Sequence, residues 1–270
     1  MERRDFVTAS AVATMGGLAG CGGLLSDSDS PGPRYTVTMA PVGEVGFDSV
    51  PESWATYTPG YAEMGIALGQ AGGLETIGYK PRFYTDRYTD FGVDIDEGSL
   101  QQLYDGDLGK EQFYGIDADV HLIDPNWLVN NFKGWEQSDV DTIASKTGPF
   151  VGNVIFRQTD DWHDYRYYSM YEAFEKVSQV FQTGDRYEAM ASMHEEYVQG
   201  RVADNLPPES ERPEAMLVYA GTDEPAEFAP YPLETAGTGA KHLRDLGVKD
   251  AVEGNDVEGL SSTNRTKIDY

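Results

Sequence analysis

Cysteine is nearly absent from this sequence, in which Cys21 is the single cysteine among 270 residues. A chain with one cysteine forms no internal disulfide and offers no second thiolate for a structural metal site. Because Cys21 lies close to the start of the chain, a catalytic cysteine in the folded domain is excluded too. Its position is better explained by attachment of a lipid than by redox chemistry.

Positive charge is also scarce, with 20 Lys and Arg against 46 Asp and Glu and a formal net charge of -26. Such a field repels phosphates and anionic lipid headgroups, so we expect no nucleic-acid partner. Arginines (12) outnumber lysines (8), and this acidic surplus resembles that of proteins from high-salt organisms, where salt screens self-repulsion. A content of 40% hydrophobic and 12% aromatic residues argues against a disordered chain.

Common catalytic motifs are missing as well. The sequence has no nucleophile elbow, no P-loop and no zinc-protease helix motif, and residues 237–239 (GTG) lack the third glycine of a dinucleotide fingerprint. The four histidines are scattered, which disfavours a zinc site. Residues 161–164 (DWHD) are the best candidate for a metal or acid/base cluster, although such a group often arises by chance on an acidic chain. We therefore predict no enzyme activity, no cofactor and no bound metal.

The start of the chain is typical of an export signal. Arg3 and Arg4 resemble a twin-arginine signal, an apolar stretch follows, and residues 18–21 (LAGC) resemble a lipobox. The apolar stretch is too short and glycine-rich to span a bilayer. We predict a signal over residues 1–21, a lipid on Cys21, a flexible tether over 22–34, and a location on the outer face of the cell membrane. The alternative is a cytosolic chain with a frayed start and an incidental cysteine.

Beyond the tether, short apolar runs alternate with helical patterns, which indicates an α/β fold with a mostly parallel sheet. The predicted strands of the first part are residues 35–39, 53–57, 82–84, 120–123 and 154–156. The predicted helices are residues 61–70, 99–104, 110–114 and 139–144. Residues 215–219 and 241–246 predict a further strand and helix, the latter ended by Gly247. These patterns predict a first lobe over 35–164 and a second over 207–270.

Between the two lobes lies the longest helical pattern of the sequence. Apolar residues recur at steps of three and four from Tyr167 to Val202, so we predict a connecting helix over 165–206. Gly184 lies within this stretch, and glycine costs about 1 kcal/mol inside a helix. Gly184 therefore leaves open a division into two helices.

Several segments resemble one family. The order and spacing of these segments are similar to those of ABC-transporter substrate-binding proteins of the ferric-siderophore and cobalamin class, and most similar to ferric-hydroxamate binding lipoproteins of salt-loving archaea. The resemblance covers residues 35–270, with Ala118 in place of the family's usual proline. It is carried by residues 51–63 (PESWATYTPGYAE), 67–69 (ALG), 117–124 (DADVHLID), 183–190 (TGDRYEAM) and 265–270 (RTKIDY).

The resemblance implies the class III fold of periplasmic binding proteins, which has two Rossmann-like lobes joined by one long helix. Family members usually continue well beyond the equivalent of Tyr270, so we expect the second lobe to be incomplete. The implied function is capture of a ferric siderophore and its delivery by a monomer to an ABC permease. We expect Glu111 and Glu234 to dock on this permease. Alternatives are a cobalamin or haem carrier, an anchored structural or adhesion protein without a small-molecule ligand, and an extracellular hydrolase.

Candidate ligand-binding residues follow the predicted strands. Ligands of open α/β sheets lie outside the carboxyl ends of the strands, where aromatic walls and forked arginine donors suit a bulky chelate with a polar rim. We expect six of them (Tyr57, Tyr61, Tyr84, Arg87, Trp127 and Trp162) to converge at one edge of the first lobe's sheet. The full set of candidates is Tyr57, Pro59, Gly60, Tyr61, Tyr84, Arg87, Tyr88, Asn126, Trp127, Arg157 and Trp162.

Overall fold

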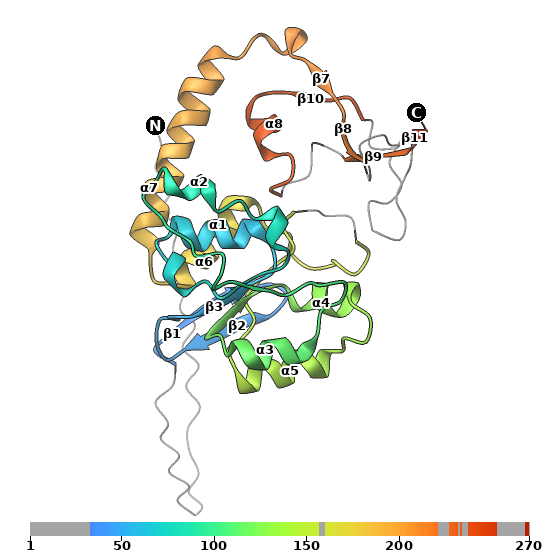
Figure 1. The fold of residues 1–270 in the computed structure, drawn as a ribbon. Helices are drawn as coiled ribbons and strands as arrows, with labels where there is room; N and C mark the ends of the chain where they lie inside the picture. The colour runs from blue at the N-terminus through green and yellow to red at the C-terminus, as the bar shows by residue number, and fades with distance from the viewer. Residues whose placement is uncertain are drawn as a thin grey trace, which may run out of the picture. The chain divides into compact units, whose positions relative to one another are not determined.

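The computed structural model describes residues 33–156, 160–220, 227–231, 233, 237–252 and 268–269 (Figure 1). The predicted signal, Cys21 and nearly all of the predicted tether lie outside these residues, and so do Arg157 and Glu234. In the described part of the chain, no helix is long and apolar enough to cross a lipid bilayer.

The first lobe opens with an antiparallel hairpin of β1 (Tyr35–Met39) and β2 (Gly43–Phe47). Every second residue of both strands is buried, because side chains alternate between the two faces of a strand. Gly43 lies in the turn with φ +88°, a conformation that glycine adopts without steric cost. The strand predicted over 35–39 is confirmed.

A parallel sheet forms the centre of this lobe. β3 (Trp54–Thr56) pairs with β6 (Val120–Leu122), and β4 (Thr76–Ile77) pairs with β5 (Gln101–Gln102), both in parallel. Backbone hydrogen bonds join the β4–β5 pair to the β3–β6 pair. The amide of Glu75 donates to the carbonyl of Trp54, and the amide of Gly78 donates to the carbonyl of Tyr57. On the far side of β6, the extended chain around Phe150 bridges to His121 in parallel. The order across the sheet is β5, β4, β3, β6 and the chain at 149–151.

Helices cover both faces of this sheet. Trp54, Val120 and Leu122 point into one hydrophobic cluster, whereas Ala55 and Ile123 point into a second cluster on the opposite face. Figure 1 shows α1 (Pro59–Ala67) and α6 (Met170–Val180) on one side of the strands. On the other side it shows α3 (Lys110–Ile116), α4 (Pro125–Asn131) and α5 (Gln137–Lys146). The remaining short helices of the lobe are α2 (Asp86–Thr89), η1 (Ala71–Gly73) and η2 (Lys80–Arg82).

Two helices take the place of the single connecting helix predicted over 165–206. α6 (Met170–Val180) begins at a capping box of Ser169 and Glu172, and Gln182 then adopts φ +54°, which ends the helix. α7 (Gly184–Glu195) follows and continues as a π-helical stretch (Glu196–Val202) and a 3-10 turn (Ala203–Asn205). The break falls beside Gly184, as the alternative interpretation of the sequence allowed.

The second lobe differs from a purely parallel arrangement. β7 (Glu214–Ala215) pairs in parallel with β10 (Lys249–Asp250), and α8 (Lys241–Asp245) precedes β10. In contrast, β8 (Leu217–Ala220) and β9 (Glu227–Tyr231) pair antiparallel, and β11 (Ile268–Asp269) is antiparallel to β9. Only a few residues connect β8 to β9, which is too short a connection for a parallel crossover. A 3-10 turn (Glu209–Glu211) precedes β7.

Three predictions of local structure were wrong. Residues 82–84 were expected as a strand, but Arg82 is the last residue of the 3-10 turn η2 and the other two follow it. Residues 99–104 were expected as a helix, but they contain strand β5. Residues 154–156 are extended but join no strand ladder. Pro81 explains the first error, because a proline near the start of a helical turn is well accommodated there. The strands of this sheet are two or three residues long, so the window that defines a sequence period exceeds their length.

His121 in β6 is fully buried and carries a pH-dependent part of the stability. Its Nε2 lies 2.9 Å from Oγ1 of Thr147, whose hydroxyl already donates to Ile143, so the imidazole donates from Nε2 and its Nδ1 has no hydrogen-bond partner. Burial lowers the pKa of His121 to about 4. Since the unfolded chain binds this proton more readily, stability falls as pH decreases from the ordinary histidine pKa towards 4.

We expect His121→Leu to remove this loss, which amounts to roughly 3 kcal/mol across the whole window. Urea unfolding midpoints of both proteins at several pH values measure it. Burial raises the pKa of Asp124, so protonation of Asp124 increases the stability as pH falls below about 6, which is the opposite of the effect of His121. Because Asp124 is present in both proteins, the difference in stability between the wild type and His121→Leu isolates the contribution of His121. A difference that is constant with pH would contradict the assignment.

Candidate ligand-binding cavity

The topology of the first lobe fixes where its strands leave a crevice. From β3 the chain passes to β4 and then β5 on one side, whereas β6 lies on the other side of β3. The connections that follow β3 and β6 therefore depart in opposite directions. Open α/β sheets bind ligands at such a switch point, beyond the carboxyl ends of the strands. Here this position lies between Tyr57 and Asp124.

A cavity of about 1180 Å³ opens at this point. Its lining comes from the loops after β3, β4, β5 and β6, from α4, from the extended chain at 153–156, and from the second lobe. The lining residues are Tyr57, Thr58, Pro59, Gly60, Tyr61, Tyr79, Arg82, Tyr104, Asp105, Gly106, Leu122, Ile123, Asp124, Trp127, Asn131, Phe132, Asn153, Val154, Ile155, Phe156, Leu217, Pro230, Tyr231, Thr238 and Gly239.

Aromatic rings form one continuous wall of the cavity. The ring of Trp127 lies 4.5 Å from that of Tyr57 and 5.0 Å from that of Phe132, and Tyr104 lies 6.3 Å from Phe132 on the other side. Burial, together with Tyr104, raises the pKa of the Tyr57 phenol to about 12, so the wall is uncharged at neutral pH. The rings are inclined to one another, by 59° between Tyr57 and Trp127 and by 85° between Trp127 and Phe132. A neutral wall of such rings offers a large contact area with few torsions to immobilise.

The inner end of the cavity is organised around Asp124, which is 3% exposed. As the N-cap of α4, its Oδ1 accepts from the amides of Asn126 at 3.0 Å and Trp127 at 3.4 Å. Its Oδ2 accepts from the amide of Val154 at 2.9 Å and the hydroxyl of Tyr165 at 2.6 Å. One carboxylate therefore holds the β6–α4 corner, the extended chain at 153–156 and the segment that leads to α6.

Tyr61 in α1 secures the same extended chain from another direction. Its hydroxyl donates to the carbonyl of Asn153 and accepts from the amide of Asn153, both at 2.9 Å. The side-chain amide of Asn153 in turn donates to the carbonyls of Ala40 and Arg166. The backbone that lines the cavity is thus tied to the hairpin, to α1 and to the segment before α6, which makes its shape largely preformed.

The second lobe contacts this extended chain directly. The amide of Thr238 donates to the carbonyl of Ile155 at 2.8 Å, and the hydroxyl of Tyr167 donates to the same oxygen at 2.9 Å. The hydroxyl of Tyr231 donates to the carbonyl of Phe156. Tyr231 and Thr238 therefore contribute the second lobe's part of the cavity lining.

Five of the residues predicted from the sequence line this cavity: Tyr57, Pro59, Gly60, Tyr61 and Trp127. Trp162 does not line it and stacks instead on His163, with ring centroids 5.6 Å apart. Asn126 contributes its amide to Asp124, and Tyr88 packs on Phe83. Glu111 is exposed on α3, where the predicted contact with a permease stays a prediction.

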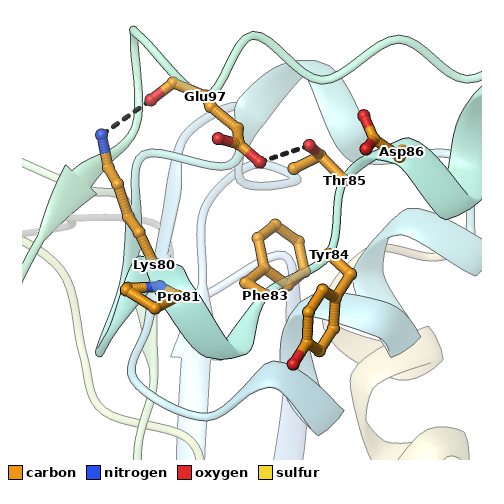
Figure 2. A pocket seen from close by; sticks show the side chains of 7 residues that line it. All are labelled: Lys80, Pro81, Phe83, Tyr84, Thr85, Asp86 and Glu97. Carbon is orange, nitrogen blue, oxygen red and sulfur yellow. Dashed lines mark hydrogen bonds between the residues drawn. The ribbon is translucent and has the colours of Figure 1, made fainter.

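Tyr84 and Arg87 belong to a separate surface region. Tyr84 lines a pocket of about 290 Å³ (Figure 2), in which the hydroxyl of Thr85 donates to Glu97 and the ammonium group of Lys80 donates to the carbonyl of Glu97. The guanidinium of Arg87 lies 4.7 Å from the centre of the Tyr84 ring. The convergence that the sequence predicted therefore holds in space for Tyr57, Tyr61 and Trp127, and not for Tyr84, Arg87 or Trp162.

Sequence reasoning missed Tyr79, Arg82, Tyr104 and Asp124. Tyr79 and Arg82 follow β4, but the strand was expected several residues later, and this shift transferred the expected contacts to Tyr84 and Arg87. Tyr104 follows β5, which was expected to be helical. A signal for Asp124 was present, because an aspartate before a proline at the end of a buried strand is typical of a helix N-cap.

Within the described residues, no three side chains of His, Cys, Asp or Glu lie together as a metal site would require. The side chains of the DWHD segment, which the sequence offered as a candidate cluster, are separated there, since His163 is buried among aromatic rings whereas Asp161 and Asp164 are exposed.

No protein-family model matches this chain, and no curated protein matches it in sequence. Solved structures with a similar fold do exist. The iron uptake ABC transporter substrate-binding protein PiuA from Streptococcus pneumoniae has a TM-score of 0.57 and 17% identity, covering 87% of this chain and 72% of that chain. The siderophore binding protein BauB, bound to two molecules of acinetobactin and ferric iron, has a TM-score of 0.53 and 17% identity, covering 81% and 68%.

A mutant of the heme binding protein HmuT is similar to the same degree, with a TM-score of 0.53 and 15% identity over 86% of this chain and 68% of that chain. Likeness at these identities establishes the fold. The chain has an α/β binding-protein fold, as the resemblance of its motifs implied.

Proposed function

We propose that this protein is the extracytoplasmic solute-binding protein of an ABC importer and that it captures a ferric siderophore of the hydroxamate type. The observation that carries the proposal is the preformed, aromatic-walled cavity of about 1180 Å³ at the switch point of the first lobe. Pockets for ordinary small ligands measure roughly 300–1,000 Å³, so this cavity has room for a bulky chelate. Proteins of similar fold are described as iron uptake, siderophore binding and heme binding proteins.

In this proposal the protein holds the chelate and does not ligate the iron itself. The wall formed by Tyr57, Trp127 and Phe132 packs against the organic shell, and Arg82 at the mouth supplies donors to the polar rim. We propose no catalytic role. The loaded monomer would pass its ligand to a permease, and we propose that a lipid on Cys21 keeps it at the outer face of the membrane.

Haem is the second candidate, because a heme binding protein has a similar fold and the cavity wall is aromatic. A cobalamin carrier and an anchored protein without any ligand are the remaining alternatives. The cavity distinguishes the last of these, since a purely structural protein has no need of a large preformed site beyond its sheet.

Titration of the purified protein with ferrichrome, ferrioxamine B, haem and cobalamin, followed by quenching of tryptophan fluorescence, tests the proposal. Trp127 lines the cavity, so we expect saturable quenching by the ferric hydroxamates with one ligand per chain. Tight binding of haem alone or of cobalamin alone would replace our assignment. Saturation by none of the four would favour the structural role.

A further inference from the structure

The charges that line the cavity are few and unevenly placed. Among its described lining residues, Arg82, Asp105 and Asp124 are the charged ones. Arg82 and Asp105 are exposed, so water screens their fields. Asp124 is 3% exposed at the inner end, where the surrounding dielectric is low and its field is strong. The electrostatic character of the inner cavity is therefore dominated by one carboxylate.

All four hydrogen bonds that Asp124 accepts come from uncharged donors. Three are backbone amides, from Asn126, Trp127 and Val154, and the fourth is the hydroxyl of Tyr165. These donors stabilise the ionised form but bring no positive charge to it. The carboxylate keeps its net charge, and its lone pairs are already occupied, so it acts on a ligand through its field.

Among the residues that the structure describes, the titratable groups that face Asp124 add no cation. Tyr61 from α1 and Tyr165 have their pKa raised by burial, and both stay neutral. His163, whose ring lies 4.2 Å from that of Tyr165, has its pKa lowered by burial and is neutral at pH 7. Asp160 and Asp164, which act electrostatically on His163, are acidic side chains and add no cation.

We propose that the buried carboxylate of Asp124 makes this cavity select ferric chelates of positive or zero overall charge over anionic chelates. The inference rests on the proposed function, because it names the charge class of the ligand at the same site. At an effective dielectric constant of about 20, one unit charge at a distance of about 8 Å changes an affinity roughly 30-fold. Asp124 is therefore a specificity-determining residue.

Proton linkage gives this selectivity a signature that shape alone does not produce. Burial raises the pKa of Asp124 to about 6. A cationic chelate favours the ionised carboxylate, so its affinity falls as pH decreases through 6. An anionic chelate favours the protonated form, so its affinity rises over the same range. The two chelates thus respond to pH with opposite signs.

The test uses three ferric chelates with one iron centre: ferrioxamine B, its N-acetyl derivative and its N-succinyl derivative, which are cationic, neutral and anionic. Affinities are measured by fluorescence titration at about pH 8 and about pH 5.5, on either side of the pKa of Asp124. We expect the cationic chelate to bind most tightly and the anionic one least at the higher pH, with about tenfold or more between them. The differences should shrink at the lower pH.

Asp124→Asn removes the charge while keeping an N-cap acceptor, and we expect the order of affinities and its pH dependence to vanish. Asp105→Asn is the matched control at the exposed mouth of the cavity. It should change the ratio of the affinities for the cationic and anionic chelates less than about twofold. Tyr165→Phe retains the carboxylate of Asp124 but removes one hydrogen-bond donor to its ionised form, which raises the pKa of Asp124 further. The order of affinities should therefore be the same at the higher pH, and the differences should begin to shrink at a higher pH than in the wild type. If Asp124→Asn does not fold, the affinities of the wild type and of Tyr165→Phe for the three chelates at the two pH values still test the proposal.

Equal wild-type affinities for the three chelates, or an unchanged order in Asp124→Asn, would overturn the inference while leaving the proposed function intact. Binding of none of the three by the wild type would overturn both. A preference for the anionic chelate at the higher pH would show that a cation controls the site and would also refute the inference.

Discussion

Replacing Gly152 with alanine is expected to destabilise the protein by about 3 kcal/mol and to weaken ligand binding at least tenfold. A Cβ at this position would lie 2.4 Å from the carbonyl carbon of Ile123 and 2.7 Å from the amide nitrogen of Asp124. Both are backbone atoms of the β6–α4 corner, so no side chain can rotate away to make room. The extended chain must move off β6 instead.

That movement would separate groups on which the cavity depends. The hydrogen bond from the amide of Val154 to Asp124 and the bonds between Asn153 and Tyr61 all depend on the position of this extended chain. Urea denaturation measures the stability change, and fluorescence titration with ferrioxamine B measures the binding change. Gly115→Ala in α3 is the control, because no atom lies within 4 Å of its added Cβ, and it should be neutral or stabilising by up to about 1 kcal/mol. An unfolding midpoint of Gly152→Ala equal to that of the wild type would contradict the close packing.

Truncating Trp127 to alanine is expected to cost about 4 kcal/mol of folding stability and about 2 kcal/mol of ligand binding. The structure buries Trp127 to 8% exposure within the second hydrophobic cluster, against Tyr57 and Phe132. Its indole is at once a wall of the cavity and a part of the core.

Trp127→Phe separates the two roles, because the smaller ring retains contact with the core but recedes from the cavity. We expect it to lose less stability than the alanine variant while still weakening binding several-fold. Trp162→Ala is the matched control, since Trp162 stacks on His163 and does not line the cavity. Wild-type affinity in Trp127→Phe, or an equal loss of affinity in Trp162→Ala, would contradict the site described here.

The sequence predicted the elements of the fold well where they carry a strong local signal. The hairpin strand at Tyr35–Met39, helix α1 after Pro59 and helix α8 before Gly247 were all expected close to their observed positions. Each has a local signal: strand alternation, a proline in the first helical turn, or a glycine at φ +68° after the last turn. The α/β class followed from these signals in alternation.

The site was predicted less completely because it depends on where short buried strands end. β4 and β5 are two residues long, and neither produces a hydrophobic period that a sequence can reveal. Because the strand was predicted a few residues after the position of β4, Tyr84 and Arg87 were predicted as ligand-binding residues in place of Tyr79 and Arg82. The role of Asp124 depends on Val154 and Tyr165, which lie 30 and 41 residues further along the chain, and only tertiary structure brings them together.

Anomalous diffraction at the iron absorption edge, from crystals grown with ferrioxamine B, tests the central claim most directly. We expect one strong iron peak within the cavity lined by Tyr57, Trp127 and Tyr231, with the aromatic wall in contact with the organic shell of the chelate. An iron peak at the smaller pocket beside Tyr84, or crystals that take up no iron at a saturating concentration of the chelate, would contradict it.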